Sequence, residues 1–265
     1  MEPGSRIEVA TREELVYLLC QASELEHGLL LEYLFAMYSL TRHEDEGISA
    51  DQLGAINRWE RVIASVAAQE MLHLAIVSNL LTALGAAPHF ERPNYPHPAR
   101  CYPGGIQLAL VPVGEQALRH FLYLERPEGM ELEDAEGFAV LNEALPISDP
   151  DTVVPYHQEY KTVGQLYRGI ERGFARLVER YGEERLFLGT PRAQIAGSAF
   201  RWPELAPVTT LVGVHHLIDT VVEQGEGARG DCREAHFGRF HRVLEELRAA
   251  READPGFEPS RPDRG

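Results

Sequence analysis

The sequence contains few cysteines and few basic residues. Cys20, Cys101 and Cys232 are the three cysteines in 265 residues, and no C-x-x-C pair occurs, so we expect neither a disulfide framework nor a thiolate zinc site. Lys and Arg number 25 against 41 Asp and Glu, which gives a formal charge of −16. Because nucleic acids attract basic surfaces, this charge argues against a nucleic-acid partner.

Long hydrophobic runs are also missing. No window approaches the roughly 18 uninterrupted apolar residues of a transmembrane helix, and residues 1–10 lack the apolar core of a signal peptide. We therefore expect no membrane partner and a cytoplasmic location. The sequence also lacks a nucleophile elbow, a phosphate-cradling glycine loop and a dinucleotide fingerprint, so nothing indicates the chemistry that these motifs carry.

What the sequence does contain is helical periodicity in a chain of ordinary globular composition, 44% hydrophobic and 25% charged. Apolar residues recur at steps of three and four, and Thr11 with Glu14 forms a candidate capping box. The predicted helices cover residues 11–40, 50–84, 115–124, 162–181, 208–224 and 232–251. The sequence thus predicts an all-α fold, a four-helix bundle with an extra C-terminal helix.

The segments between these helices are unusually elaborate. Residues 86–114 and 183–207 are rich in proline, and we interpret them as a crossover loop and an insertion that form the walls of a pocket. A weak alternation over 105–111 is the only indication of a strand. We expect one helical domain over residues 1–252 and a disordered tail over 253–265.

Glu70-Met-Leu-His73 is the central motif. At a spacing of three, both side chains leave one face of a helix and can reach one metal ion. The motif alone is weak, because about one such match is expected by chance with 11 His in the chain, and Glu24-Leu-Glu-His27 is a second one. Its context is stronger: it lies within a long apolar helix, where an unpaired carboxylate is costly.

Four other acidic residues occur in similarly apolar predicted helices: Glu26, Glu171, Glu223 and Glu226. One carboxylate from each of two helices, with a paired motif from each of the other two, is the layout of di-iron and di-manganese bundles. The fourth helix offers Glu223 and Glu226 but no histidine at the matching position. His236, or else His215 or His216, would have to supply the second imidazole.

Simpler interpretations stay open for several of these residues. His73 could be a hydrogen-bonded core histidine, and Glu171 could be a partner of Arg168 or Arg172. Glu32 is interpreted as a surface or interface charge and not as a ligand, because it lies six residues from Glu26 and points elsewhere on the helix. Three aromatic residues are predicted to lie in the core: Tyr33, Tyr38 and Trp59.

Three segments resemble a known family, Glu24 to Leu34, Ala68 to Phe90 and Ile218 to Gly227. The chain resembles, over most of residues 10–250, the ferritin-like domain shared with iminophenyl-pyruvate dimer synthases of bisindole biosynthesis and its stand-alone bacterial relatives. The resemblance implies a ferritin-like bundle with long crossover loops, and an oxidative, iron-dependent role in small-molecule biosynthesis. The metal ligands that it implies are Glu26, Glu70, His73, Glu223 and Glu226, with His236 and Glu171 as additions.

Together these features lead to the hypothesis of a non-haem dimetal oxidase or oxygenase. It would hold two Fe ions, or Mn, and act with O₂ on a small amine- or amino-acid-derived metabolite. The rival hypotheses are metal storage with ferroxidase activity and a metal-free helical scaffold. Whether the chain forms a homo-oligomer is left open.

Overall fold

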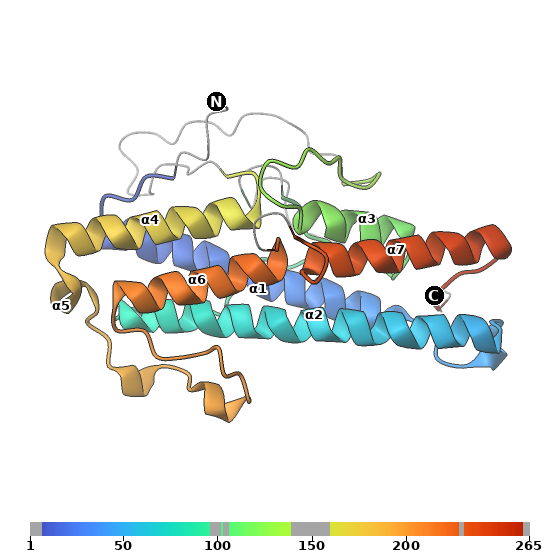
Figure 1. Cartoon of the computed structure of the whole chain (residues 1–265), viewed down its shortest axis with the longest axis horizontal. Helices are drawn as coiled ribbons and strands as arrows, with labels where there is room; N and C mark the ends of the chain where they lie inside the picture. The colour runs from blue at the N-terminus through green and yellow to red at the C-terminus, as the bar shows by residue number, and fades with distance from the viewer. Residues whose placement is uncertain (1–6, 96–101, 103–105, 139–159, 228–230, 262–265) are drawn as a thin grey trace.

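Two long helices run through the whole molecule. The computed structural model describes residues 7–95, 102, 106–138, 160–227 and 231–261. Within them, α1 (Arg12–Ser39) and α2 (Ala50–Ala83) lie side by side along the long axis (Figure 1). The 34 residues of α2 span about 51 Å.

Both long helices begin at a capping box. Thr11 and Glu14 exchange side-chain and backbone hydrogen bonds at the start of α1, as predicted, and Ser49 and Gln52 do the same for α2. These caps satisfy N–H groups that a helix leaves without partners in its first turn. They therefore fix where each helix begins.

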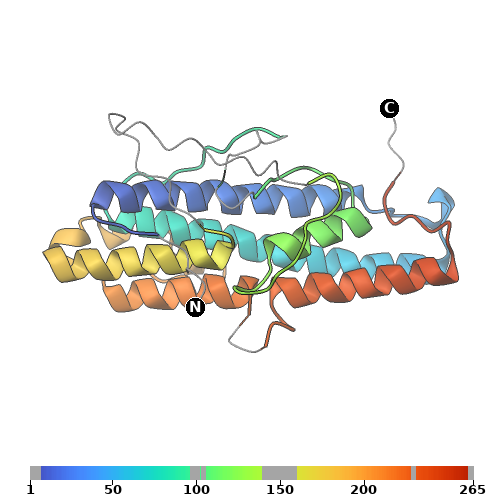
Figure 2. The same ribbon diagram turned by 90° about the horizontal axis from the view of Figure 1, so that it is seen from above.

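The third and fourth helices of the bundle are each interrupted near the middle, so that each consists of two shorter helices in line, here called a rod. α3 (Glu115–Leu124) and α4 (Val163–Tyr181) lie in line, and so do α6 (Leu211–Gly225) and α7 (His236–Ala253) (Figures 1 and 2). α4 packs against α6 and α1, while α7 packs against α3 and α2. The all-α four-helix prediction is confirmed. The predicted extra C-terminal helix is the second half of the fourth rod.

Where the structure describes the segments that join the long helices, it shows only short helical turns in them. η1 (Glu44–Glu46), α5 (Glu183–Leu186), η3 (Pro191–Ala193) and η4 (Gly197–Ala199) were not predicted. Residues 106–111 form no strand, so the prediction for that segment is wrong where the structure describes it. One backbone N–H there, that of Ala109, donates to the side chain of Glu32 instead of to a neighbouring strand.

The end of the chain packs against the bundle. Phe257 is 2% exposed, and its ring lies 6.2 Å from that of Trp59. Arg261 N donates to Ser39 O at 2.8 Å. The predicted disorder of 253–265 therefore differs from the structure up to Arg261, because one aromatic side chain anchors the segment; residues 262–265 lie outside the described residues.

The apolar character of α2 arises from its place in the core. By length and composition α2 is the one helix, among the described residues, that could cross a membrane, but 61% of its most apolar window is buried inside the protein. Tyr33 and Trp59 are buried nearby, as predicted. Tyr38 is 67% exposed, so its predicted place in the core is wrong.

A buried acid–base cluster links α1 and α3 to the segment that follows α3. His120 Nδ1 lies 2.8 Å from Asp134 Oδ1, and His120 Nε2 lies 3.7 Å from Glu32 Oε2. Phe138 stacks on the imidazole at 3.8 Å. Glu32 is fully buried within the chain, so its interpretation as a surface or interface charge is wrong. Burial alone would lower the pKa of His120, but Asp134 and Glu32 raise it to about 9.

This pKa shift predicts pH-dependent stability. Since the folded-state pKa of His120 is above its unfolded value of about 6.5, its contribution is complete below that pH and is lost as pH rises through about 9. We expect His120→Gln to lower the free energy of unfolding by about 2 kcal/mol at pH 6, and the difference to shrink by pH 10. Urea unfolding at both pH values tests this, with exposed His216→Gln as the control. A difference that does not change with pH would contradict it.

Candidate metal centre

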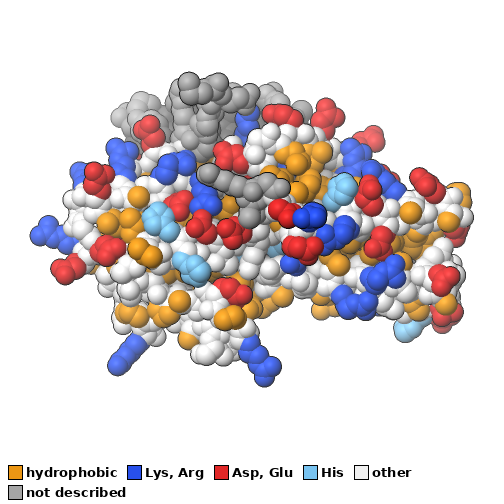
Figure 3. All heavy atoms as spheres, viewed as in Figure 1, with side chains coloured by type: hydrophobic (Ala, Val, Ile, Leu, Met, Phe, Trp, Pro, Cys, Tyr) orange, Lys and Arg blue, Asp and Glu red, His pale blue; other side chains and the backbone are white. Residues whose placement is uncertain are grey.

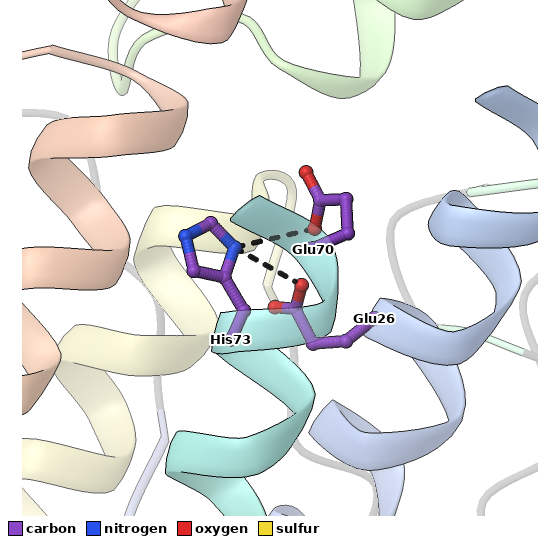
Figure 4. A group of neighbouring side chains, drawn as sticks. All are labelled: Glu26, Glu70 and His73. Carbon is purple, nitrogen blue, oxygen red and sulfur yellow. Dashed lines mark hydrogen bonds and ion pairs between the residues drawn. The ribbon is translucent and has the colours of Figure 1, made fainter. Parts of the chain in front are cut away.

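Two groups of buried acids and imidazoles lie inside the bundle and share one residue. Glu26, Glu70 and His73 form the first group, and Glu70, Glu125 and His236 form the second. Within each group one ligand atom per residue lies within 4.8 Å of the others, which is close enough to surround a metal ion. Figure 4 shows the first group, in which Glu26 of α1 reaches across to Glu70 and His73 of α2.

Glu70 faces both imidazoles at once. Its Oε2 lies 3.2 Å from Nδ1 of His73, and its Oε1 lies 2.9 Å from Nδ1 of His236. Glu26 Oε2 is 3.3 Å from the first imidazole, and Glu125 Oε1 is 3.4 Å from the second. Glu70 therefore lies between two candidate metal positions, each of which would have its own histidine and its own further carboxylate.

The helix interruptions position the second group. Glu125 is the C-cap of α3, and His236 is the first residue of α7. A small cavity lies between the two groups, and Glu226, the C-cap of α6, lines it together with Glu70 and Glu125. Glu70 and His73, in contrast, lie within the unbroken α2. The two continuous helices, α1 and α2, thus meet the ends of four further helices, α3, α4, α6 and α7, at one level of the bundle (Figure 1).

The buried charges strongly perturb one another. Burial, with repulsion from Glu70, raises the pKa of Glu26 to about 8. Burial also opposes ionisation of Glu70, yet His73 and His236 hold its pKa well below the usual range. Burial would lower the pKa of His236, but Glu125 and Glu70 raise it to about 9. Such a cluster binds protons where it could bind cations, so metal binding would release protons.

The donor set fits two divalent cations. Apart from its ion pair with His73, buried Glu26 Oε2 has no hydrogen-bond partner among the described residues, as expected of an atom that would bind a metal. Four carboxylates line the cavity, those of Glu26, Glu70, Glu125 and Glu226, and their charge balances two divalent ions when both histidines are neutral. The cavity measures about 10 Å³, room for little more than one water-sized sphere.

Glu226 is held at the start of α4. Its Oε1 accepts from Gly164 N at 2.9 Å and its Oε2 from Glu128 N at 3.1 Å. A Cβ atom at Gly164 would lie 2.3 Å from Glu226 Oε1, so the glycine leaves the space that the carboxylate occupies. The N-terminus of a helix favours a negative charge, which lowers the cost of burying this acid.

Two tyrosines orient the outer carboxylates. Tyr167 donates to Glu26 Oε1 at 2.6 Å, and Tyr33 donates to Glu125 Oε1. Both phenols are fully buried, and burial, together with the negative charge of these carboxylates, raises the pKa of each well above its ordinary value. They are therefore fixed hydrogen-bond donors at neutral pH.

The structure brings together most of the residues predicted from the sequence, but not all. Glu26, Glu70, His73 and His236 meet in the two groups, and Glu226 lines their cavity. Two predicted ligands, Glu171 and Glu223, belong to neither group and do not line the cavity. The proposed ligand set therefore leaves these two out.

Glu171 is engaged elsewhere. Its carboxylate lies 3.0 Å from Arg168 Nη1 and 2.6 Å from His215 Nδ1, which confirms the alternative interpretation of Glu171 as a partner of Arg168. It follows the start of α4 by eight residues, about 12 Å along the axis from the interruption. Glu223 is exposed, because it lies two residues, about 200° around α6, from buried Val221.

Sequence reasoning missed Glu125. It stands where a predicted helix gave way to an irregular segment, and no E-x-x-H pattern marks it. A signal was present: Glu125 follows Phe121 by four residues and Leu118 by seven, so it continues the buried face of α3. Of the three candidate histidines, His236 supplies the second imidazole, while His216 is exposed.

The predicted pocket walls are a further correction. None of the residues that line the cavity comes from the described parts of 88–112 or from 183–207. Its walls are formed by α1, α2 and the ends of the interrupted helices, among them Val163, Gly164 and Gly225.

Comparison with known proteins agrees with this architecture. The chain is 26% identical over 90% of its length to dichlorochromopyrrolate synthase of Lentzea aerocolonigenes. It is 26% identical over 98% of its length to 2-imino-3-(indol-3-yl)propanoate dimerase of Chromobacterium violaceum. The chain spans about a quarter of the length of these relatives, 25% and 26%.

A solved structure and a family of proteins extend the comparison. A ferritin-like protein from Caulobacter vibrioides superposes with a TM-score of 0.58 at 20% identity, over 89% of this chain and 73% of that one. The sequence pattern of the ferritin-like family matches residues 19–245. The chain therefore belongs to the ferritin-like family.

Proposed function

We propose that the protein is a non-haem dimetal oxidoreductase that uses O₂ to oxidise a small amine- or amino-acid-derived molecule. The observation that carries the proposal is the pair of buried ligand groups that share Glu70. Carboxylates with imidazoles suit iron or manganese, and iron is our first choice. A bound metal pair would supply the redox chemistry that no side chain here provides.

The protein's own residues would fix the geometry of this centre. Glu70 presents one oxygen to each metal position, while Tyr167 and Tyr33 hold the outer carboxylates of Glu26 and Glu125 in place. Such partners behind the ligands tune metal affinity and limit ligand movement. The high pKa of Glu26, about 8, lets this carboxyl hold a proton at neutral pH when metal is absent.

The relatives suggest a substrate class. One of them is, by name, a dimerase of an indolyl imino acid, so imines and amines derived from aromatic amino acids are the first compounds to test. The chain corresponds to about a quarter of that protein, and the dimerisation itself is therefore not carried over.

Metal content and O₂ uptake test the proposal together. Protein purified without chelators should contain about two iron or manganese ions per chain by elemental mass spectrometry. Its iron(II)-loaded form should consume O₂ faster when a suitable amine or amino-acid-derived imine is present. No bound metal, and none taken up on anaerobic reconstitution, would instead favour a scaffold role.

Metal handling is the second candidate, and the size of the cavity favours it. About 10 Å³ accommodates ions rather than an organic molecule. Oxidation and accumulation of many irons per chain without any organic substrate would establish storage and contradict the enzyme proposal.

The proposed partners are O₂ and a small molecule. Figure 3 shows acidic and basic side chains interspersed over one face, without a continuous basic strip in its coloured part of the kind that nucleic acids favour. A cytoplasmic location and the absence of membrane and nucleic-acid partners remain predictions, and so does any homo-oligomer.

A further inference from the structure

Each histidine of the centre is hydrogen-bonded by a glutamine from another helix. His73 of α2 has Nδ1 toward the carboxylates and Nε2 3.0 Å from Oε1 of Gln224 on α6. His236 of α7 has Nδ1 toward the carboxylates and Nε2 3.2 Å from Oε1 of Gln69 on α2. The two amides therefore occupy corresponding places behind the two metal positions.

Arg239 fixes the orientation of one of these amides. Its Nη1 lies 2.9 Å from Oε1 of Gln69, and a guanidinium can only donate hydrogen bonds. The amide atom at that point must therefore be the oxygen, and not the nitrogen. Because this oxygen can only accept, Nε2 of His236 carries the hydrogen. In the neutral ring this leaves the lone pair on Nδ1, which faces the carboxylates.

In the other half of the centre, no described Arg or Lys stands beside the glutamine in this way. Among the described residues Gln224 forms no further hydrogen bond and has no Arg or Lys partner, and α6 ends one residue later. On the Gln69 side the positive charge of Arg239 polarises the amide oxygen, which makes it a weaker acceptor for the N–H of His236. The same charge repels a cation held at Nδ1. The two halves, similar in ligands, therefore differ electrostatically.

We infer that Gln69 and Gln224 are positioning residues that present Nδ1 of the two histidines to the metals, and that Arg239 makes the His236 position the weaker one, so that the centre fills in order. The inference rests on the proposed dimetal function. It predicts a tight first ion in the His73 half and a weaker second ion in the His236 half.

Titration of the metal-free, full-length chain with Mn²⁺, with the free ion quantified by electron paramagnetic resonance, tests this order. The unaltered protein should bind two ions in separate steps. Gln69→Ala should weaken the second step about 10- to 100-fold and leave the first within about twofold, whereas Gln224→Ala should weaken the first step. Gln116→Ala, at an exposed glutamine of α3, is the control and should change neither step.

Charge variants distinguish positioning from a merely structural role. Gln69→Glu can still accept from Nε2 and adds a negative charge, so it should tighten the second step where alanine weakens it. Arg239→Gln should tighten the second step about three- to tenfold, and Arg239→Lys, which keeps the charge, should not.

The outcomes separate the two proposals. If two Mn²⁺ bind to the unaltered protein in equal steps, or the glutamine and arginine variants leave both steps unchanged, the inference is wrong and the dimetal site stands. If the protein binds neither Mn²⁺ nor Fe²⁺ under anaerobic conditions, the proposed function fails and the inference fails with it.

Discussion

The substitution Glu70→Gln is expected to weaken the binding of both metal ions, each by on the order of 100-fold or more, because Glu70 is the one residue that belongs to both ligand groups. Glutamine keeps the shape of the side chain but removes the charge that faces the two imidazoles. Mn²⁺ titration, with iron content after purification as a second measurement, would show this loss.

Matched variants make that result specific. Glu26→Gln and Glu125→Gln each remove a carboxylate that belongs to one group only, so each should weaken one binding step. Glu223→Gln, at an exposed position on α6, should weaken neither. If Glu70→Gln affected one ion and spared the other, Glu70 would not lie between two metals.

The substitution Phe240→Ala is expected to cost about 3–5 kcal/mol of unfolding free energy, the largest effect on stability that we predict outside the metal ligands. Phe240 is fully buried, and its ring lies 5.0 Å from that of Tyr33 and 5.1 Å from that of Phe121. Alanine would leave a cavity that these rings cannot fill without moving. Urea unfolding of the metal-free protein measures the loss.

An exposed phenylalanine provides the control for this prediction. Phe90 is 54% exposed, so Phe90→Ala should change the unfolding free energy by less than about 0.5 kcal/mol. A loss below about 1 kcal/mol for Phe240→Ala would show that this aromatic cluster is not a rigid part of the core. A loss of about 3–5 kcal/mol would instead support tight packing of Phe240 against the ring of Tyr33.

The unbroken helices could be predicted closely from the sequence. Local signals suffice there: the capping box at Thr11 and the apolar steps of three and four place α1 within a residue or two of Arg12–Ser39. The same holds for the first half of the centre, since Glu70 and His73 lie on one helix and share a face because of their spacing.

The second half of the centre depends on tertiary structure. Glu125 and His236 lie 111 residues apart, and nothing local shows that the ends of α3 and α7 meet. Glu32 was misplaced for a similar reason. Its spacing from Glu26 was interpreted correctly, but His120 and Asp134 cover the face to which it points. Burial of a charged residue depends on what packs against it, and periodicity alone does not contain that information.

The contrast between unbroken and interrupted rods has a consequence for how the protein can vary. One residue inserted between Glu70 and His73 would rotate one ligand by about 100° around α2 and remove it from the centre. The spacing of Glu226 and His236 along the chain is not fixed in this way, because a loop separates α6 from α7. Insertions there, or between α3 and α4, would lengthen a loop and leave every ligand on its own helix end. The chain therefore contains two places beside the proposed metal centre where evolution can add or remove residues without separating the candidate ligands.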